Sequence, residues 1–303
     1  MPDLSVNIGS LKLKNPVLVA SGTFGYGDEF KEIFDLNILG GIVVKGISLR
    51  PKEGNPPPRI AETPCGMLNS IGLENIGVER FLKDRLPSLK ELKTEIFVNI
   101  YGKSVEEYAE LASILKGVEG ISALEVNISC PNVKEGGMIF GSNPLWASRV
   151  TEAIVKNTDK MVIVKLSPNV TDISIIAKVV EDSGAHAISL INTITGMKVD
   201  VQSIRPVLGK IFGGLSGPAI RPVALYMVYQ VVKTVKIPVI GIGGIVSAED
   251  ALEFLIVGAK AIQIGTANFI HPDIASKIIK ELEEYLYAYN IKSINDIIGS
   301  LRV

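Results

Sequence analysis

A strand runs into a loop in the stretch Leu124-Glu-Val-Asn-Ile-Ser-Cys130-Pro-Asn-Val-Lys-Glu-Gly-Gly-Met-Ile-Phe-Gly-Ser-Asn-Pro144. An alternating run with β-branched residues reaches Ser129, and Pro131 ends the ladder because proline has no backbone N–H to donate. Cys130 therefore lies where a strand passes into a glycine-bearing loop. Reacting groups collect at such strand ends in β/α barrels, although most free cysteines are small buried hydrophobes. The position alone leaves both interpretations of Cys130 open.

Similar apolar runs, rich in valine and isoleucine, recur along the chain. The eight candidate strands cover residues 16–22, 41–47, 95–101, 123–129, 161–167, 187–193, 237–243 and 261–266. Near-continuous apolar strands are buried on both faces, which is typical of parallel sheets covered by helices. The pattern therefore predicts a parallel sheet with helices between its strands.

Helices are expected between these runs because apolar residues recur there every three or four positions. They cover residues 78–92, 105–116, 144–157, 171–183, 218–235, 248–257 and 272–289. Residues suited to N-caps are Ser104, Asn143, Thr171 and Ser247, and Gly184 and Gly258 suit the position after a C-cap. Eight β/α units in about 250 residues predict a (β/α)8 TIM barrel. A doubly wound open sheet is the alternative, but it would usually have fewer strands and a glycine-rich first turn.

A hairpin and two insertions depart from this rhythm. Residues 4–15 alternate in polarity around Gly9-Ser10, which predicts an N-terminal hairpin. Segment 49–76, with Asn55-Pro-Pro-Pro58, and segment 195–217 would emerge on the C-terminal face of the barrel, where insertions build active sites. With no linker in the sequence, residues 1–303 are expected to form one barrel domain.

Composition excludes several classes of protein. The 303 residues are 47% hydrophobic and carry a net charge of −1, so a nucleic-acid partner is not expected. The first residues do not resemble a signal peptide, and no apolar run reaches the roughly 18 residues of a membrane span. Two cysteines and two histidines argue against a disulfide scaffold, an iron–sulfur cluster and a histidine-based metal site. We expect a cytoplasmic protein with no metal site.

Polar side chains lie near the C-terminal ends of the candidate strands. They are Ser21, Lys45, Asn99, Asn127, Lys165, Asn192 and Thr193. A lysine inside an apolar run is costly unless it meets an anion or an electron-rich group; snorkelling or an internal salt bridge is the structural alternative.

Glycine-bearing loops follow the last two candidate strands, at Gly241-Ile-Gly-Gly244 and Gly265-Thr266. In barrels these two loops commonly bind phosphate through backbone N–H groups and a helix N-terminus. Together with the two lysines, they predict a phosphorylated cofactor across the mouth of the barrel.

The chain resembles the dihydroorotate dehydrogenases, the FMN-dependent barrel enzymes of pyrimidine biosynthesis. The motifs that carry the resemblance are Asn127-Ile-Ser-Cys-Pro-Asn132, Met67-Leu-Asn-Ser-Ile-Gly-Leu-Glu-Asn75, Gly241-Ile-Gly-Gly244 and Lys45-Gly46. Cys130 is similar to the cysteine of class 1 enzymes, since class 2 enzymes have serine there and an N-terminal extension. Residues 21–27 and 131–137 resemble class 1B more than class 1A.

The resemblance implies oxidation of dihydroorotate to orotate in UMP biosynthesis, with a hydride passing to N5 of FMN and a proton to Cys130. A thiol titrates near ~8.5, which suits a general base, and loop 131–143 is expected to close over the substrate. Class 1B further implies a partner subunit that bears FAD and a [2Fe–2S] cluster. It also implies NAD⁺ as acceptor and a heterotetramer built around a homodimer.

The resemblance also assigns binding residues. Those expected for dihydroorotate are Lys45, Asn69, Ser70, Ile71, Gly72, Leu73, Asn127, Asn192 and Thr193. Those expected for FMN are Ser21, Lys45, Gly46, Asn99, Asn127, Lys165, Ile191, Gly217, Gly243, Gly244, Gly265 and Thr266, with the phosphate at the last four. Lys165 is expected beside the flavin N1/C2 edge, where its charge favours the anionic reduced form.

Three alternatives remain open at this point. A related FMN barrel of the dihydropyrimidine dehydrogenase type would act on uracil or thymine, and a class 1A enzyme would pass its electrons to fumarate. A non-catalytic barrel would only bind a phosphorylated ligand or act as a scaffold, but the polar strand ends argue against it.

Overall fold

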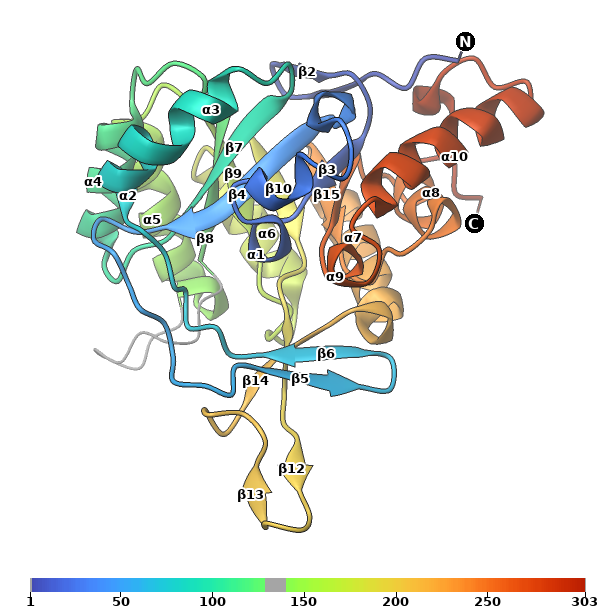
Figure 1. The fold of residues 1–303 in the computed structure, drawn as a ribbon. Coiled ribbons are helices and arrows are strands. Elements are labelled where there is room, and N and C mark those ends of the chain that lie inside the picture. Colours follow the sequence, from blue (N-terminus) through green and yellow to red (C-terminus); the bar gives the residue numbers. More distant parts are fainter. Residues whose placement is uncertain (1, 129–139, 303) are drawn as a thin grey trace.

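The computed structural model describes residues 2–128 and 140–302 (Figure 1). Eight parallel strands form a closed barrel, and each of them falls within an expected strand segment. They are β3 (Val17–Val19), β4 (Gly41–Ile47), β7 (Glu95–Ile100), β8 (Ala123–Asn127), β9 (Met161–Lys165), β10 (Ala187–Leu190), β15 (Val239–Ile242) and β16 (Ala261–Ile264). Each strand pairs with its predecessor, and β16 pairs with β3 to close the ring. The predicted TIM barrel is confirmed.

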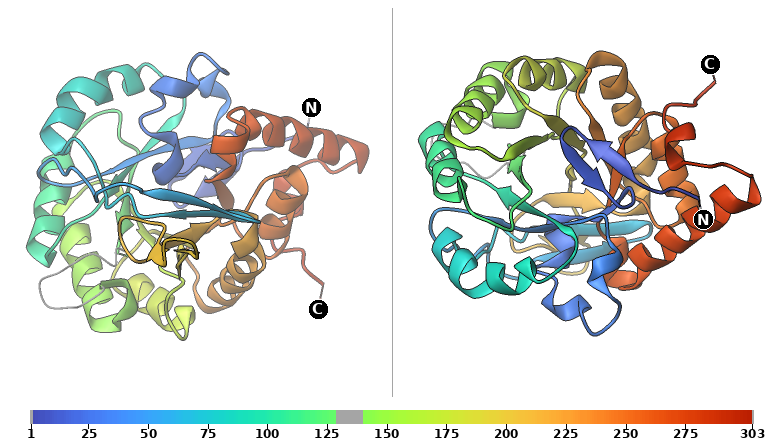
Figure 2. Two further views of the ribbon diagram at one scale, coloured as in Figure 1. Left: turned by 60° about the horizontal axis from the view of Figure 1, so that its bottom comes forward. Right: turned by 90° about the horizontal axis from the view of Figure 1, so that it is seen from above.

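Helices surround the barrel between these strands (Figure 2). The main ones are α4 (Val105–Leu115), α5 (Pro144–Asn157), α6 (Ile173–Asp182), α7 (Arg221–Thr234), α8 (Ala248–Ile256) and α10 (Ile274–Ala288). A composite segment before β7 consists of α2 (Val78–Arg80), a π-helical turn (Phe81–Arg85) and α3 (Leu86–Lys90), while α1 (Ser21–Phe24) and α9 (Ala267–Ile270) are single turns. On α4 the residues Tyr108, Leu111, Ala112 and Leu115 are buried, which is the three- and four-residue spacing of an amphipathic helix.

Three of the four expected N-caps are confirmed. The side chains of Ser104, Asn143 and Ser247 accept hydrogen bonds from backbone N–H groups in the first turns of α4, α5 and α8. The prediction for Thr171 is wrong, because Asp172 caps α6 and accepts a 2.9 Å hydrogen bond from the Ser174 backbone N–H. The Ser174 hydroxyl and N–H lower the pKa of Asp172, and an anion there also suits the positive end of the helix dipole.

The predicted N-terminal hairpin covers the end of the barrel opposite the insertions (Figure 2, right). It consists of β1 (Val6–Ile8) and β2 (Leu11–Leu13), and Val6, Ile8 and Leu13 are buried. Gly9 turns the chain with φ of 57°. The hairpin therefore closes the N-terminal end of the barrel with apolar side chains.

The two insertions meet at the C-terminal face, as expected, and share one antiparallel sheet. The strands β5 (Ile60–Thr63) and β6 (Gly66–Asn69) come from the first insertion, and β11 (Ile194–Gly196) and β14 (Gly213–Ser216) come from the second. The sheet order is β11-β14-β6-β5, and the sheet lies across the barrel mouth (Figures 1 and 2). We call this sheet the roof and the C-terminal ends of the barrel strands the floor.

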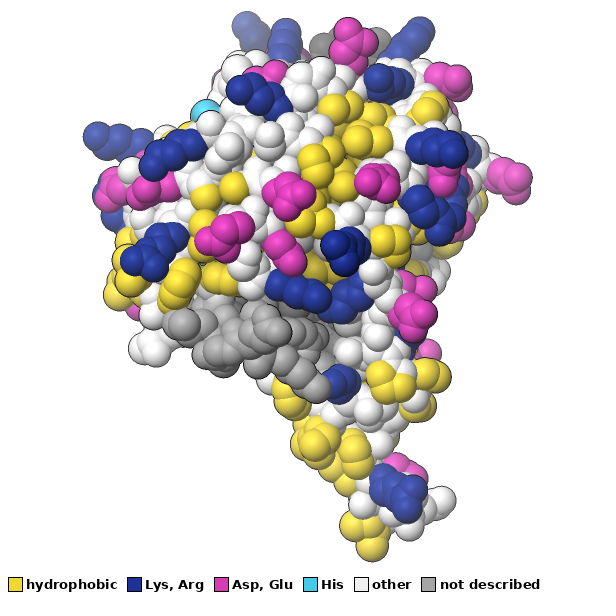
Figure 3. Space-filling view, turned by 90° about the vertical axis from the view of Figure 1, so that its left-hand side faces the viewer, with side chains coloured by type: hydrophobic (Ala, Val, Ile, Leu, Met, Phe, Trp, Pro, Cys, Tyr) yellow, Lys and Arg dark blue, Asp and Glu magenta, His cyan; other side chains and the backbone are white. Residues whose placement is uncertain are grey.

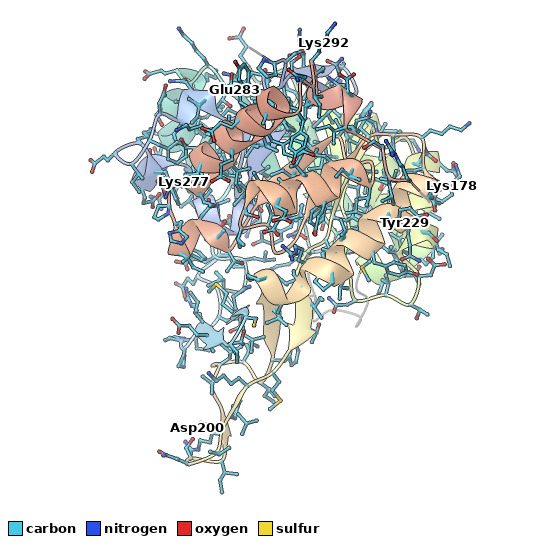
Figure 4. The ribbon with its side chains drawn as sticks, turned by 90° about the vertical axis from the view of Figure 1, so that its right-hand side faces the viewer. Lys178, Asp200, Tyr229, Lys277, Glu283 and Lys292 are labelled. Carbon is cyan, nitrogen blue, oxygen red and sulfur yellow. The ribbon has the colours of Figure 1, made fainter. Side chains whose placement is uncertain are left out.

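A second hairpin extends from the roof away from the barrel. It consists of β12 (Val199–Asp200) and β13 (Arg205–Pro206), and Figure 4 shows Asp200 at its far end, remote from Tyr229 on α7. Among the described residues, no helix combines the length and the apolar character that a membrane crossing requires.

Candidate active site between the floor and the roof

A cavity of about 630 Å³ lies between the floor and the roof. All eight barrel strands contribute to its wall at or just beyond their C-terminal ends, which is where barrel enzymes place their active sites. These contributions are Ala20, Lys45, Asn99, Asn127, Lys165, Ile191, Ile242 and Gly265. The volume is within the usual range of sites for small molecules and cofactors, about 300–1,000 Å³.

Every described residue that the sequence assigns to substrate or flavin borders this one cavity. The substrate set includes the whole segment 69–73 together with Lys45, Asn127, Asn192 and Thr193. The flavin set adds Ser21, Gly46, Asn99, Lys165, Ile191, Gly217, Gly243, Gly244, Gly265 and Thr266. The fold thus brings the two sets together, while the role of each residue stays a prediction. Cys130, the predicted base, lies outside the described residues; its strand β8 ends on the floor at Asn127.

The Lys165 ammonium is held by a carboxylate that the sequence interpretation missed. Glu125 is fully buried inside the barrel, with its Oε2 3.4 Å from Lys165 Nζ. Its carboxylate also accepts hydrogen bonds from Asn99, Ser189 and Gln263, at 2.7, 2.9 and 2.7 Å. The internal salt bridge considered as the structural alternative for Lys165 is therefore present, and Lys165 also faces the cavity. A lone acid within the apolar run 123–129 was the available signal.

Lys45 differs from Lys165 in its surroundings. It is half-buried, and no ion pair to it is found within residues 2–128 and 140–302. Its neighbour Gly46 approaches Asn99 so closely that a Cβ there would lie 2.6 Å from the Asn99 side-chain oxygen. The strand end at Lys45-Gly46 thus packs against the next strand with no room for a larger residue, and it leaves an ammonium beside the cavity.

Asparagine side chains dominate the polar wall. Asn192 Nδ2 donates to Asn127 Oδ1 at 3.3 Å, and Asn69 Nδ2 donates to the Gly214 carbonyl at 3.3 Å. The sequence interpretation missed Asn169, which bridges the Thr193 carbonyl and the Thr195 N–H at 3.0 and 2.9 Å. Asn169 lies in the loop after β9, so a search confined to strand ends could not find it. Amides offer donors and acceptors together, as a pyrimidine ring requires.

The substrate segment 69–73 is fixed from both sides. Asn55 binds the Ile71 carbonyl through its N–H and the Ser70 carbonyl through its side chain, at 3.0 and 2.9 Å. At the other end, the Leu73 carbonyl accepts hydrogen bonds from the Tyr101 hydroxyl and the Asn75 amide at 3.0 and 2.9 Å. The buried Ser70 hydroxyl has no hydrogen-bond partner among the described residues.

The loops after β15 and β16 have the features of a phosphate site. Gly243 and Gly244 have φ of 137° and 72°, values that favour glycine. No acceptor is found among the described residues for the backbone N–H groups of Gly244 and Thr266. At Gly265 an added Cβ would meet only Ala20 Cβ, at 3.9 Å. Packing within the protein therefore does not require glycine at 265, whereas close approach of a ligand to the backbone would. These observations fit a phosphorylated cofactor such as FMN.

Apolar residues complete the cavity wall and were not predicted. Ile211 and Phe212 come from the second insertion, Met67 from β6, and Phe269 from α9. Segment 195–217 has no strong periodicity, so its inward-facing residues could not be identified from the sequence. They add to the apolar wall that Leu73, Ile191 and Ile242 already provide, as is usual for sites that bind cofactors.

Comparison with known proteins agrees with this geometry. A family model described as dihydroorotate dehydrogenase matches residues 3–286. The chain is 55% identical to a protein named dihydroorotate dehydrogenase B (NAD(+)), catalytic subunit, from Geobacter sp. (strain M21), over 100% of this chain and 99% of the relative. Proteins with the same name from Maridesulfovibrio salexigens and Thermodesulfovibrio yellowstonii are 57% and 56% identical, with coverage of at least 99% of both chains. The chain therefore belongs to the dihydroorotate dehydrogenase family.

Proposed function

We propose that this chain oxidises dihydroorotate to orotate in pyrimidine biosynthesis, as the catalytic subunit of an NAD⁺-linked class 1B enzyme. The observation that carries the proposal is the convergence of segment 69–73, the amides of Asn127 and Asn192, and both lysines on one cavity. Relatives that share 54–57% identity over nearly their whole length bear the name of that catalytic subunit.

FMN is the cofactor that we propose for the cavity. The open backbone at Gly265 and the N–H groups of Gly244 and Thr266 would hold its phosphate. Lys165, Asn99 and Ser21 would line the flavin ring. Bound FMN would supply the acceptor for the hydride that leaves the substrate.

The residues of the chain itself would bind and orient the substrate. The amides of Asn69, Asn127 and Asn192 would pair with the donors and acceptors of the pyrimidine ring. The ammonium of Lys45, without an ion pair among the described residues, suits the anionic carboxylate of dihydroorotate. The roof would exclude water from the reacting carbons, and Cys130 would take the proton from the carbon next to the one that loses the hydride.

The electrons would leave through a partner subunit. The relatives are named catalytic subunits of NAD⁺-linked enzymes, which implies a second chain. We propose that this chain carries FAD and a [2Fe–2S] cluster in a heterotetramer around a homodimer, because two cysteines are too few for a cluster held by four thiolates. A cytoplasmic location is part of the same proposal.

The test is anaerobic mixing of the FMN-loaded chain with dihydroorotate, followed by its visible flavin absorbance. Rapid bleaching with formation of orotate is expected. Bleaching by dihydrouracil but not by dihydroorotate would instead identify a dihydropyrimidine reductase, and a chain that takes up no FMN would identify a non-catalytic barrel.

The acceptor is tested on the chain purified with its native associates, by comparison of NAD⁺ with fumarate. Turnover with NAD⁺, together with a co-purified FAD-bearing subunit, is expected. Turnover of the isolated chain with fumarate would identify a class 1A enzyme.

A further inference from the structure

We propose that Glu125 is a positioning residue of the cofactor site, fixing the Lys165 ammonium and the Asn99 amide without itself bordering the cavity. The inference rests on the proposed FMN-dependent function. Glu125 lies behind the floor, within the barrel, whereas Lys165 and Asn99 lie on the floor. Glu125 therefore makes no contact with a ligand in the cavity, and it can position one only through these two side chains.

Four donors from four different strands converge on the Glu125 carboxylate. Oε2 receives Asn99 from β7 at 2.7 Å and Lys165 from β9 at 3.4 Å. Oε1 receives Ser189 from β10 at 2.9 Å and Gln263 from β16 at 2.7 Å. The barrel ladder sets this arrangement, because Asn99 lies opposite Glu125, and Ser189 lies opposite Lys165, in the strand registers.

The two oxygens of Glu125 have different neighbours, and this difference suggests a role in ligand binding. The donors on Oε2, Asn99 and Lys165, border the cavity, whereas Ser189 and Gln263 on Oε1 do not. One side of the carboxylate is thus anchored in the barrel interior and the other holds two groups of the site. A lysine side chain is long and flexible, so a fixed acceptor beneath it determines where its charge lies.

Stability alone is a weak reason for this ion pair. Replacing a buried pair by apolar residues of similar volume is often neutral or stabilising, whereas removing one partner leaves an uncompensated charge. Among the described residues, Lys165–Glu125 is the ion pair with both side chains nearly inaccessible, at 7% and 0% exposure. Its location under the cofactor cavity accounts for a charge pair that packing of the barrel does not need.

Only a carboxylate can serve all four donors. In Glu125→Gln the negative charge is lost, and the amide NH₂ group takes the place of one carboxylate oxygen. Two of the four donors would then face another donor in place of an acceptor. The variant should release Lys165 from its position. Ser189→Ala is the matched control, because it removes one donor from Oε1 and leaves both cavity-facing donors in place. Thr151→Val, a buried hydroxyl on α5 that donates to the Ala147 carbonyl, controls for the general cost of a lost buried hydrogen bond.

The experiment titrates FMN into the apoproteins of the wild type, Glu125→Gln, Lys165→Met, the double variant and the two controls. It also measures the midpoint potential of bound FMN.

Glu125→Gln is expected to weaken FMN binding by about ten- to a hundredfold, the range for outer partners that orient a ligand-contacting group in metal sites. Its potential should shift to more negative values, as in Lys165→Met, because a positive charge near the flavin is no longer held there. When Lys165→Met is already present, adding Glu125→Gln should lower FMN affinity by less than about threefold. Both controls should bind FMN with wild-type affinity.

Three results would overturn the proposal. In the first, Glu125→Gln binds FMN with wild-type affinity. In the second, the loss of FMN affinity in the double variant equals the product of the losses in the two single variants. In the third, the midpoint potential of FMN bound to Glu125→Gln shifts to more positive values. The last result would mean that the carboxylate only screens the ammonium. If Glu125→Gln does not fold, the variant Glu125→Leu with Lys165→Met replaces the pair by apolar groups. If this double variant binds FMN as tightly as Lys165→Met does, the proposal is supported. If it binds FMN more than about tenfold more weakly than Lys165→Met, the proposal is contradicted. A wild-type chain that takes up no FMN would reject the proposed function instead.

Discussion

The floor and the roof of the cavity are held together by different means. The floor consists of eight strand ends in a closed hydrogen-bonded ring, and a carboxylate inside the barrel holds an amide and an ammonium on it. The roof consists of four short strands whose own apolar cluster is small, with Ala61, Leu68 and Leu208 as its buried members. The groups around the proposed cofactor are therefore on the rigid part, and Asn69, where the proposed substrate segment begins, is on the part with fewer buried contacts.

The largest expected effect concerns the chemistry beyond the end of the floor strand β8. Cys130→Ala should retain FMN but slow flavin reduction by dihydroorotate about 10²- to 10⁴-fold, the usual contribution of a general base. Stopped-flow bleaching of the bound flavin measures this rate. Near wild-type reduction in the variant would remove Cys130 from the role of base.

The next effect concerns the backbone of the floor. Gly265→Val should fill space that the protein leaves open, because an added Cβ there meets only Ala20 at 3.9 Å. Overpacking against the ligand by about 1–3 kcal/mol corresponds to roughly a five- to 150-fold loss of FMN affinity. The thermal midpoint of the apoprotein should stay close to that of the wild type. Gly265→Ala should show a smaller loss. Equal affinity of all three proteins would place the FMN phosphate elsewhere.

A smaller effect is expected from the roof. Leu68→Ala removes a buried leucine from the roof cluster, which typically costs about 2–5 kcal/mol. Because the lost packing is in the roof, KM for dihydroorotate should rise while FMN affinity stays nearly constant. Leu282→Ala on α10 is the matched control, a buried leucine of the barrel that should lower the thermal midpoint without raising KM. If both variants raise KM to the same extent, loss of packing in the roof affects substrate binding no more than loss of packing in the barrel does.

The smallest effect is expected at the hairpin that extends from the roof. Apolar side chains gather toward its tip (Figure 3), where Val201 and Ile204 are 84% and 86% exposed. Val201→Ser should change the stability of the isolated chain by less than about 0.5 kcal/mol and leave its flavin reduction unchanged. A clear loss of reduction rate would show that the hairpin, and not only the roof sheet, supports the cavity.

The barrel could be predicted because each strand and helix carries its own local signal. The run 41–47 is β4 and the periodic segment 144–157 is α5, each with the expected bounds. Where two candidates stood side by side, the local signal was insufficient: Thr171 was expected to cap α6, but Asp172 does. Both residue types are common N-caps, and the backbone conformation decides the position: Asp172 is extended and its side chain accepts from the Ser174 N–H.

The site was predictable to the extent that strand order implies it. Parallel strands in a closed ring bring their C-terminal ends together, so Lys45 and Lys165 had to face one opening once the barrel was inferred. The motifs at 67–75 and 241–244 indicated the family, and the family in turn indicated the substrate. Asn169, Phe212 and Phe269 were missed because they lie in loops, insertions or a single-turn helix, which have no sequence period.

The sequence by itself determined the barrel, the family and those cavity residues that lie at strand ends or in the recognised motifs, because these depend on local periodicity and on short motifs. Only the tertiary structure decided that two insertions more than a hundred residues apart pair as β6 and β14, with Leu68 opposite Leu215. Only it decided that Glu125, one acid in an apolar strand, receives donors from four other strands. Both are contacts between distant segments, and their free energy depends on burial and on partners that no single stretch of sequence contains.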